Sequence, residues 1–148
     1  MKFFFVAGIL LFGLLGVSPI SGEDLGNGNQ KQSQTTNAPL KAEIKLGTGV
    51  ENREPTGTNE TFSSDVTQVI GWTKIKGARE PVHVRHIWLY EGREQASVLV
   101  PVKSSSYRVW TRKAIQGRAG RWTFEIRDVQ ENVIASKDFE VAPPRPSN

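Results

Sequence analysis

Residues 81–90, PVHVRHIWLY, constrain the fold more than any other stretch of the chain. In an extended strand Val84, His86 and Trp88 share one face, while Ile87 lies on the other. The stretch is rich in β-branched and aromatic residues and has no helix-breaking signal in its interior. Because both faces carry apolar side chains, the pattern predicts a central strand that is covered on both sides, with Trp88 as its largest core group.

Further stretches alternate in the same way and are separated by polar turns. These expected strands cover residues 40–46, 65–75, 95–102, 107–112, 121–128 and 133–141. About seven strands with closely spaced turns predict an all-β fold, an immunoglobulin-like antiparallel β-sandwich, and a small β-barrel is the alternative. The chain has no cysteine, so the disulfide of true immunoglobulin domains is absent.

One strand and one connection carry more specific expectations. Pro101 has no amide donor for a ladder, so the strand at 95–102 is expected at a sheet edge. The side chains expected to point inward from this strand are those of Ala96, Val98, Val100 and Val102. Residues 47–64 are longer than most connections, which favours a functional or partly ordered segment.

The first 22 residues have the layout of a secretory signal peptide. Lys2 gives a positive start, residues 3–17 form an apolar run, and small residues follow before the acidic Glu23. The run is shorter than the ~20 residues that a membrane-spanning helix needs. We therefore expect an exported protein, periplasmic or extracellular, whose mature chain begins near Glu23; an uncleaved N-terminal membrane anchor is the alternative.

The rest of the chain divides by composition into three segments. Residues 23–40 are rich in Gln, Asn, Gly and Thr and are expected to form a disordered linker, because they have little apolar surface to bury. Residues 41–142 are expected to form the all-β domain. Residues 143–148 contain closely spaced prolines and are expected to form a disordered tail.

Composition also narrows the chemistry that this chain can perform. The formal net charge is +4 and the basic residues are not gathered into one run, so the balance does not imply nucleic acid. The absence of cysteine excludes thiolate metal sites and thiolate nucleophiles. The two histidines, His83 and His86, would lie on opposite faces of a strand and could not hold one metal ion together. We expect no metal and no cofactor, and a packed, hydrogen-bonded His86.

Catalytic signals are weak. The chain has no nucleophile-elbow motif, no phosphate-cradling glycine loop and no zinc-ligand spacing. Paired carboxylates could come from Glu51, Glu54 and Asp65 on the long connection, which would suit a hydrolase acting on an envelope polymer. Two acidic groups on a surface are nevertheless ordinary, so no catalytic residue is assigned.

The most distinctive polar pattern lies in residues 107–112. Alternation places Arg108, Trp110 and Arg112 on one face of a strand, and Lys113 and Arg121 follow in the sequence. An indole flanked by guanidinium groups can stack on planar groups or sugars and bind anions. The alternative is a structural ladder in which the arginine stems cover the indole and acids such as Glu125 pair outside it.

Other large aromatic residues occupy apolar faces with strand spacing, and core packing is their expected role. The residues expected in the core are Trp72, Trp88, Trp122, Phe124 and Phe139.

Five pieces of the sequence form a distinctive series through their order and spacing. They are residues 49–55 (GVENREP), Trp72, residues 86–88 (HIW), residues 107–113 (YRVWTRK) and residues 120–122 (GRW). Together they resemble the bacterial family called domain of unknown function 2914, over residues 41–142. The resemblance implies an all-β domain that is extracytoplasmic or membrane-tethered, with no established activity. Thr111 stands where the family tends to have serine, and Tyr107 where tryptophan is frequent.

These observations favour a non-enzymatic binding or interaction module in the bacterial cell envelope. Its expected partner is an envelope polymer or another exported protein, bound through the basic, aromatic strand at 107–112 and the loop after it. A hydrolase of an envelope polymer and a purely structural spacer domain are the alternatives.

Overall fold

The computed structural model describes residues 39–115 and 117–144, so the expected signal peptide and most of the expected linker lie outside the described residues. The described chain forms strands and no helix. The strands are β1 (Lys41–Gly47), β2 (Gly49–Glu51), β3 (Glu54–Thr56), β4 (Thr61–Ser63), β5 (Gln68–Lys76), β6 (Val82–Tyr90), β7 (Arg93–Val102), β8 (Ser106–Ala114), β9 (Gly120–Arg127) and β10 (Val133–Ala142).

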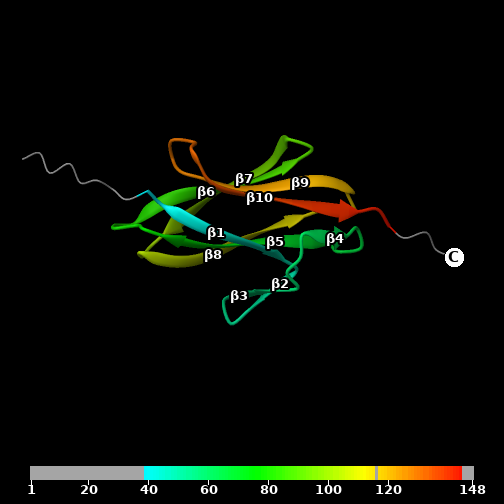
Figure 1. Ribbon diagram of the computed structural model, residues 1–148, viewed down its shortest axis with the longest axis horizontal. Helices are drawn as coiled ribbons and strands as arrows, with labels where there is room; N and C mark the ends of the chain where they lie inside the picture. The colour runs from blue at the N-terminus through cyan, green and yellow to red at the C-terminus, as the bar shows by residue number, and fades with distance from the viewer. Residues whose placement is uncertain (1–38, 116, 145–148) are drawn as a thin grey trace, which may run out of the picture. The chain divides into compact units, whose positions relative to one another are not determined.

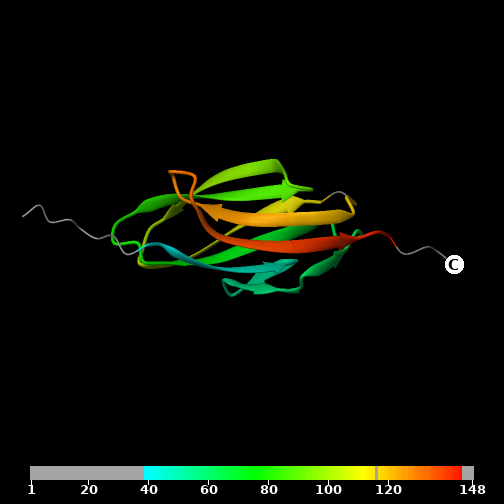
Figure 2. The ribbon, with the colours of Figure 1, turned by 45° about the horizontal axis from the view of Figure 1, so that its top comes forward.

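The strands form two packed sheets, which confirms the predicted β-sandwich. One sheet has three strands in the order β1-β5-β8, and the other has five in the order β4-β10-β9-β6-β7. Neighbours within both sheets run antiparallel, except β4, which runs parallel to β10. Figures 1 and 2 show the two layers, with the β2–β3 hairpin on the side of the three-stranded sheet that faces away from the other layer.

The long strands are the seven that alternation predicts, and the three short ones all lie in the long connection, residues 47–64. This connection is therefore partly ordered. β2 and β3 pair as a tight hairpin whose tip residues, Asn52 and Arg53, have φ angles of 49° and 65°. Two successive left-handed residues match the right-handed twist of the flanking strands, as in type I′ turns.

The predicted central strand, β6, lies inside the five-stranded sheet between β7 and β9. Its inner side chains Val84, His86 and Trp88 are fully buried. The prediction that both of its faces are covered is wrong, because the second sheet packs on one face only. On the outer face His83 is exposed, and Ile87 is buried beside its neighbours within the sheet.

Instead, β5 is the strand that is buried on both faces. Val69 and Ile75 point into the sandwich, while Ile70 and Trp72 lie on the outer face and are 3% and 1% exposed. Gly71 is needed on the inner face, since a Cβ atom there would collide with the ring of Phe124. The β2–β3 hairpin covers Trp72 on the outer face of β5, whereas Lys74 is half-buried and Lys76 is exposed.

β7 lies at a sheet edge, as Pro101 predicts. Val100 and Val102 are buried, and Ala96 is half-buried. Val98 lies opposite the buried His86 in the register, on the inward face as predicted, but its side chain is 38% exposed. An edge strand has a neighbour on one side only, so its middle residues lie next to solvent.

Aromatic side chains of the five-stranded sheet form the centre of the core. Trp88 packs against Phe124 with ring centroids 4.4 Å apart, and Trp122 stacks on Phe139 at 6.1 Å. The five aromatic side chains expected in the core are between 0% and 3% exposed, but Trp72 is buried under the β2–β3 hairpin on the outer face and not between the sheets.

One buried polar network crosses this core, centred on His86. The His86 ring nitrogens Nε2 and Nδ1 lie 3.2 Å from Thr73 Oγ1 and 3.1 Å from Thr111 Oγ1. Thr73 donates to the carbonyl of Val109, and Trp88 Nε1 donates to Thr111. Because Thr73 donates its hydroxyl proton to Val109, His86 Nε2 donates to Thr73, and Thr111, which accepts from Trp88, can donate its own proton to Nδ1 of a neutral ring.

Burial lowers the pKa of His86 from 6.5 to about 3, which keeps the ring neutral at ordinary pH.

Candidate functional site

The strand β8 presents its predicted polar residues on the outer surface of the sandwich. Arg108, Trp110 and Arg112 alternate along this strand, which forms one edge of the three-stranded sheet. The opposite face points inward, because Thr111 bonds to the buried His86. The structure therefore brings these three side chains together on one solvent-facing surface, as the sequence pattern predicts.

The neighbouring strands extend this surface with further cations. In the register of the sheet, Lys74 of β5 lies opposite Arg108, and Trp72 lies opposite Trp110. On the far side of β5, Lys45 of β1 lies opposite Trp72 and its ammonium group is 5.3 Å from the centre of the indole ring. A row of one lysine and two tryptophans thus crosses the sheet.

We call the outer face of β1, β5 and β8 the basic face. Sheet register and alternation place six cations on it, namely Lys41, Lys45, Lys74, Lys76, Arg108 and Arg112, with Glu43 as the acid on the same three strands. Such an excess of one charge raises the local concentration of anions at the surface.

The β2–β3 hairpin lies over part of the basic face and is attached to it by two polar contacts. Trp72 donates its indole N–H to the carbonyl of Arg53, at the hairpin tip, over 2.8 Å. Glu54 forms an ion pair with Arg108, with 2.9 Å between carboxylate oxygen and Nε. Trp72 is therefore buried, whereas Trp110 stays half-exposed and Arg112 exposed.

The structure separates the other two predicted binding residues from this surface. Lys113 lies opposite Val69 in the sheet register, so it belongs to the inward face of β8. Arg121 lies on β9, in the other sheet. Glu125, expected as an acid partner for the arginine ladder, instead binds Arg127 over 2.7 Å.

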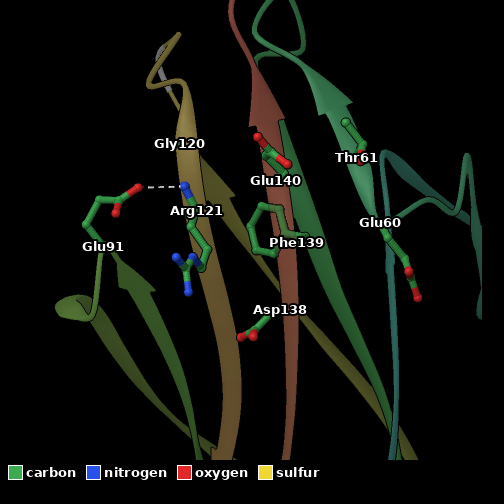
Figure 3. Close-up of a pocket in the computed structure, with 8 residues that line it drawn as sticks. All are labelled: Glu60, Thr61, Glu91, Gly120, Arg121, Asp138, Phe139 and Glu140. Atoms are coloured by element: carbon green, nitrogen blue, oxygen red, sulfur yellow. Dashed lines mark hydrogen bonds between the residues drawn. The ribbon is translucent and has the colours of Figure 1, made fainter.

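Arg121 lines a shallow polar cleft at the end of the five-stranded sheet where β9 begins and β10 ends (Figure 3). The cleft has a volume of about 590 Å³ and is lined by Glu60, Thr61, Glu91, Gly120, Arg121, Asp138, Phe139 and Glu140. Several of its acids already have partners: Glu91 accepts from the Arg121 amide, Glu60 pairs with Lys137, and Asp138 accepts from Thr123. Four of the lining residues are acids, so the cleft is acidic. Its residues come from distant parts of the sequence, so the alternation within a single strand could not predict the cleft.

Two of the three carboxylates considered for hydrolysis have partners in the structure, and Glu51 is exposed. Glu51 and Glu54 lie opposite each other in the β2–β3 hairpin, and Glu54 is bound to Arg108. Asp65 accepts a hydrogen bond from the hydroxyl of Ser63 in the turn after β4. Within the described residues no three His, Asp or Glu side chains are placed to hold a metal ion. The same residues, 39–115 and 117–144, include no apolar helix of membrane-spanning length.

Comparison with known families gives one match. Residues 81–141 match the model of a family described as "Protein of unknown function (DUF2914)". The match confirms the resemblance over these residues, which run from the start of β6 almost to the end of β10 and include β8. Residues 41–80, which hold β1 and the hairpin, lie outside it. A search of curated proteins finds no match.

Among solved structures, two of a β-glucosidase from Kluyveromyces marxianus are similar to this chain. The selenomethionine-labelled enzyme has 8% identity and a TM-score of 0.42, and the complex with glucose has 10% identity and a TM-score of 0.40. Each alignment covers 70% of this chain but 14% of the enzyme. Similarity at this level supports no statement about activity.

Proposed function

We propose that this protein is a non-enzymatic binding module, exported to the bacterial cell envelope, that binds an anionic envelope polymer through the basic face. The observation that carries the proposal is the placement of Arg108, Trp110 and Arg112 side by side on the outer surface of an edge strand. The export part of the proposal rests on the apolar leader at residues 3–17 and on the family resemblance.

The chemistry of the basic face suits an acidic polysaccharide. Guanidinium groups bind carboxylates and phosphates through two parallel hydrogen bonds. The half-exposed indole of Trp110 offers an apolar surface between Arg108 and Arg112, on which a sugar ring can pack. A ligand with anionic groups on both sides of an apolar ring surface would satisfy all three side chains together.

A binding module also fits the arrangement of the carboxylates better than a hydrolase does. Hydrolysis by paired carboxylates needs one acid and one base or nucleophile facing the same bond. Glu54 faces Arg108, Asp65 is hydrogen-bonded to Ser63, and in the described residues none of Glu51, Glu54 and Asp65 lines the acidic cleft. We therefore assign no catalytic residue.

The double variant Arg108→Ala, Arg112→Ala tests the proposal. It should lose binding to polygalacturonate, a linear polysaccharide with one carboxylate per sugar, and keep its melting temperature within a few degrees. Exposed cations of this kind contribute about 0–1 kcal/mol each to folding stability. Binding is measured as the fluorescence anisotropy of labelled polymer at low salt, because screening weakens such contacts.

The matched control is Arg79→Ala together with Arg93→Ala, which removes the same charge from exposed positions outside the basic face. This control should bind as the unaltered protein does. Equal losses in both double variants, or no binding by the unaltered protein, would reject the basic face as the binding surface and favour a spacer domain. Unfolding of the first variant would instead identify Arg108 and Arg112 as a structural ladder, and the single variant Arg112→Gln then tests binding at the more exposed position.

A further inference from the structure

We infer that Glu54 is a built-in competitor for the anionic ligand: its carboxylate occupies Arg108 in the free protein and must leave before a polymer can bind both arginines. This inference rests on the proposed function of the basic face, and it assigns to the β2–β3 hairpin the role of selecting ligands that carry several acidic groups.

The contact between Glu54 and Arg108 resembles the contact that a ligand would make. The Glu54 carboxylate lies 2.9 Å from Nε of Arg108, and the Glu54 and Arg108 side chains are 49% and 39% exposed. Nε itself is buried and makes no hydrogen bond, so the pair is a charge contact without hydrogen-bond alignment. A ligand carboxylate is the same chemical group and would compete for the same guanidinium charge. Because both side chains reach solvent, the pair can be exchanged without opening the core.

The hairpin backbone explains why Glu54 stays close to Arg108. Asn52 and Arg53 form a left-handed tip, and the carbonyl of Arg53 accepts the indole N–H of Trp72. This bond holds the hairpin tip over the sheet. Because Glu54 is the residue after Arg53, the backbone then places its side chain next to Arg108 of β8. Only its side chain needs to rotate for a ligand to replace it.

A second feature of the hairpin makes the Glu54 contact easy to replace. Glu51 lies directly opposite Glu54 in the register of β2 and β3. Like charges at such positions repel each other. The ion pair with Arg108 offsets this repulsion in the free protein, and rotation of Glu54 away from the hairpin would also relieve it.

The spacing of the arginines gives the selectivity. Arg108 and Arg112 are four residues apart on one strand, which corresponds to about 13 Å at ~3.3 Å per residue. A ligand with a single acidic group can bind Arg112 and leave Glu54 in place. A polymer with repeated acidic groups can bind Arg112 first and then displace Glu54 at a high effective concentration.

The experiment compares Glu54→Gln with Glu51→Gln in the full-length protein. Both variants remove one negative charge from the same hairpin, but only Glu54 is bound to Arg108. Glu54→Gln should raise the affinity for polygalacturonate about two- to fivefold, the range expected for half-exposed ion pairs, and Glu51→Gln should change it less. Neither variant should change the affinity for monomeric galacturonate appreciably.

The Arg108→Gln background separates competition from a general charge effect. With the glutamine at 108, Glu54→Gln should no longer raise the affinity. Equal gains from Glu51→Gln and Glu54→Gln would overturn the inference, and so would a lower affinity of Glu54→Gln, which would make Glu54 a positioning residue for Arg108. If Arg112→Gln abolishes binding while Glu54→Gln has no effect, the proposed function stands and the inference fails; if Arg112→Gln has no effect, the proposed function itself fails.

Discussion

Replacing Trp88 with alanine should lower the free energy of unfolding by about 3–5 kcal/mol, the range found for large aromatic residues in cores. Trp88 is 0% exposed and contacts both Phe124 and Phe139. The substitution also removes the N–H that donates to Thr111, a member of the buried network. Since domains of this size are stable by about 5–15 kcal/mol, this loss is a large fraction of the total. Urea unfolding followed by circular dichroism measures it.

Trp110→Ala is the matched control for this experiment. Trp110 has the same side chain but is half-exposed on the edge strand β8, so its removal leaves no closed cavity. We expect a loss of less than half that of Trp88→Ala, together with weaker polymer binding. Equal losses of stability would contradict the assignment of Trp88 to the core and Trp110 to the basic face.

The second large effect should come from pH, through His86. The pKa of His86 is about 3 in the folded protein and 6.5 as the ordinary value, because burial disfavours the charged ring. As the pH falls below 6.5, His86 becomes protonated in the unfolded chain but stays neutral in the folded chain. Proton binding therefore stabilises the unfolded state relative to the folded state. The contribution of His86 to the free energy of unfolding should therefore be constant above pH 6.5. Below that pH the free energy of unfolding should fall by up to ~1.4 kcal/mol per pH unit towards pH 3.

Two variants isolate this contribution. His86→Gln keeps a neutral group that can donate and accept, so it should lose stability at neutral pH but show a shallower decline between pH 6.5 and pH 4. His83→Gln removes the exposed histidine on the other face of β6 and should leave the slope unchanged. Parallel pH profiles for His86→Gln and the unaltered protein, measured by urea unfolding at each pH, would show that His86 does not titrate as a buried neutral ring.

Local patterns in the sequence predict the parts of the fold that depend on strand alternation. The period of two in residues 81–90 predicts β6, and the missing amide of Pro101 predicts the edge position of β7. The same alternation predicts that Arg108, Trp110 and Arg112 share a face. Each of these features follows from the geometry of one extended chain, which needs no knowledge of the rest of the fold.

Features that depend on how strands stack are beyond such patterns. Alternation places Trp72 and Val69 on opposite faces of β5, but it does not say which of these side chains points toward the second sheet. In the structure Val69 does, and Trp72 on the outer face is covered by the β2–β3 hairpin. The ion pair of Glu54 with Arg108 joins residues far apart in the sequence. Arg121 is close to Lys113 in sequence, yet it belongs to the other sheet because the chain crosses between layers after β8.

The indole N–H signals of the four tryptophans, observed by NMR during titration with polygalacturonate, test the central claim most directly. Trp72, Trp88 and Trp122 donate to Arg53, Thr111 and Arg118, respectively. If the polymer binds the basic face, the Trp110 signal should shift most, Trp72, whose N–H stays bound to Arg53, should shift less, and Trp88 and Trp122 should stay in place. A shift of Trp122 without Trp110, or no shift at saturating polymer, would contradict binding at this face.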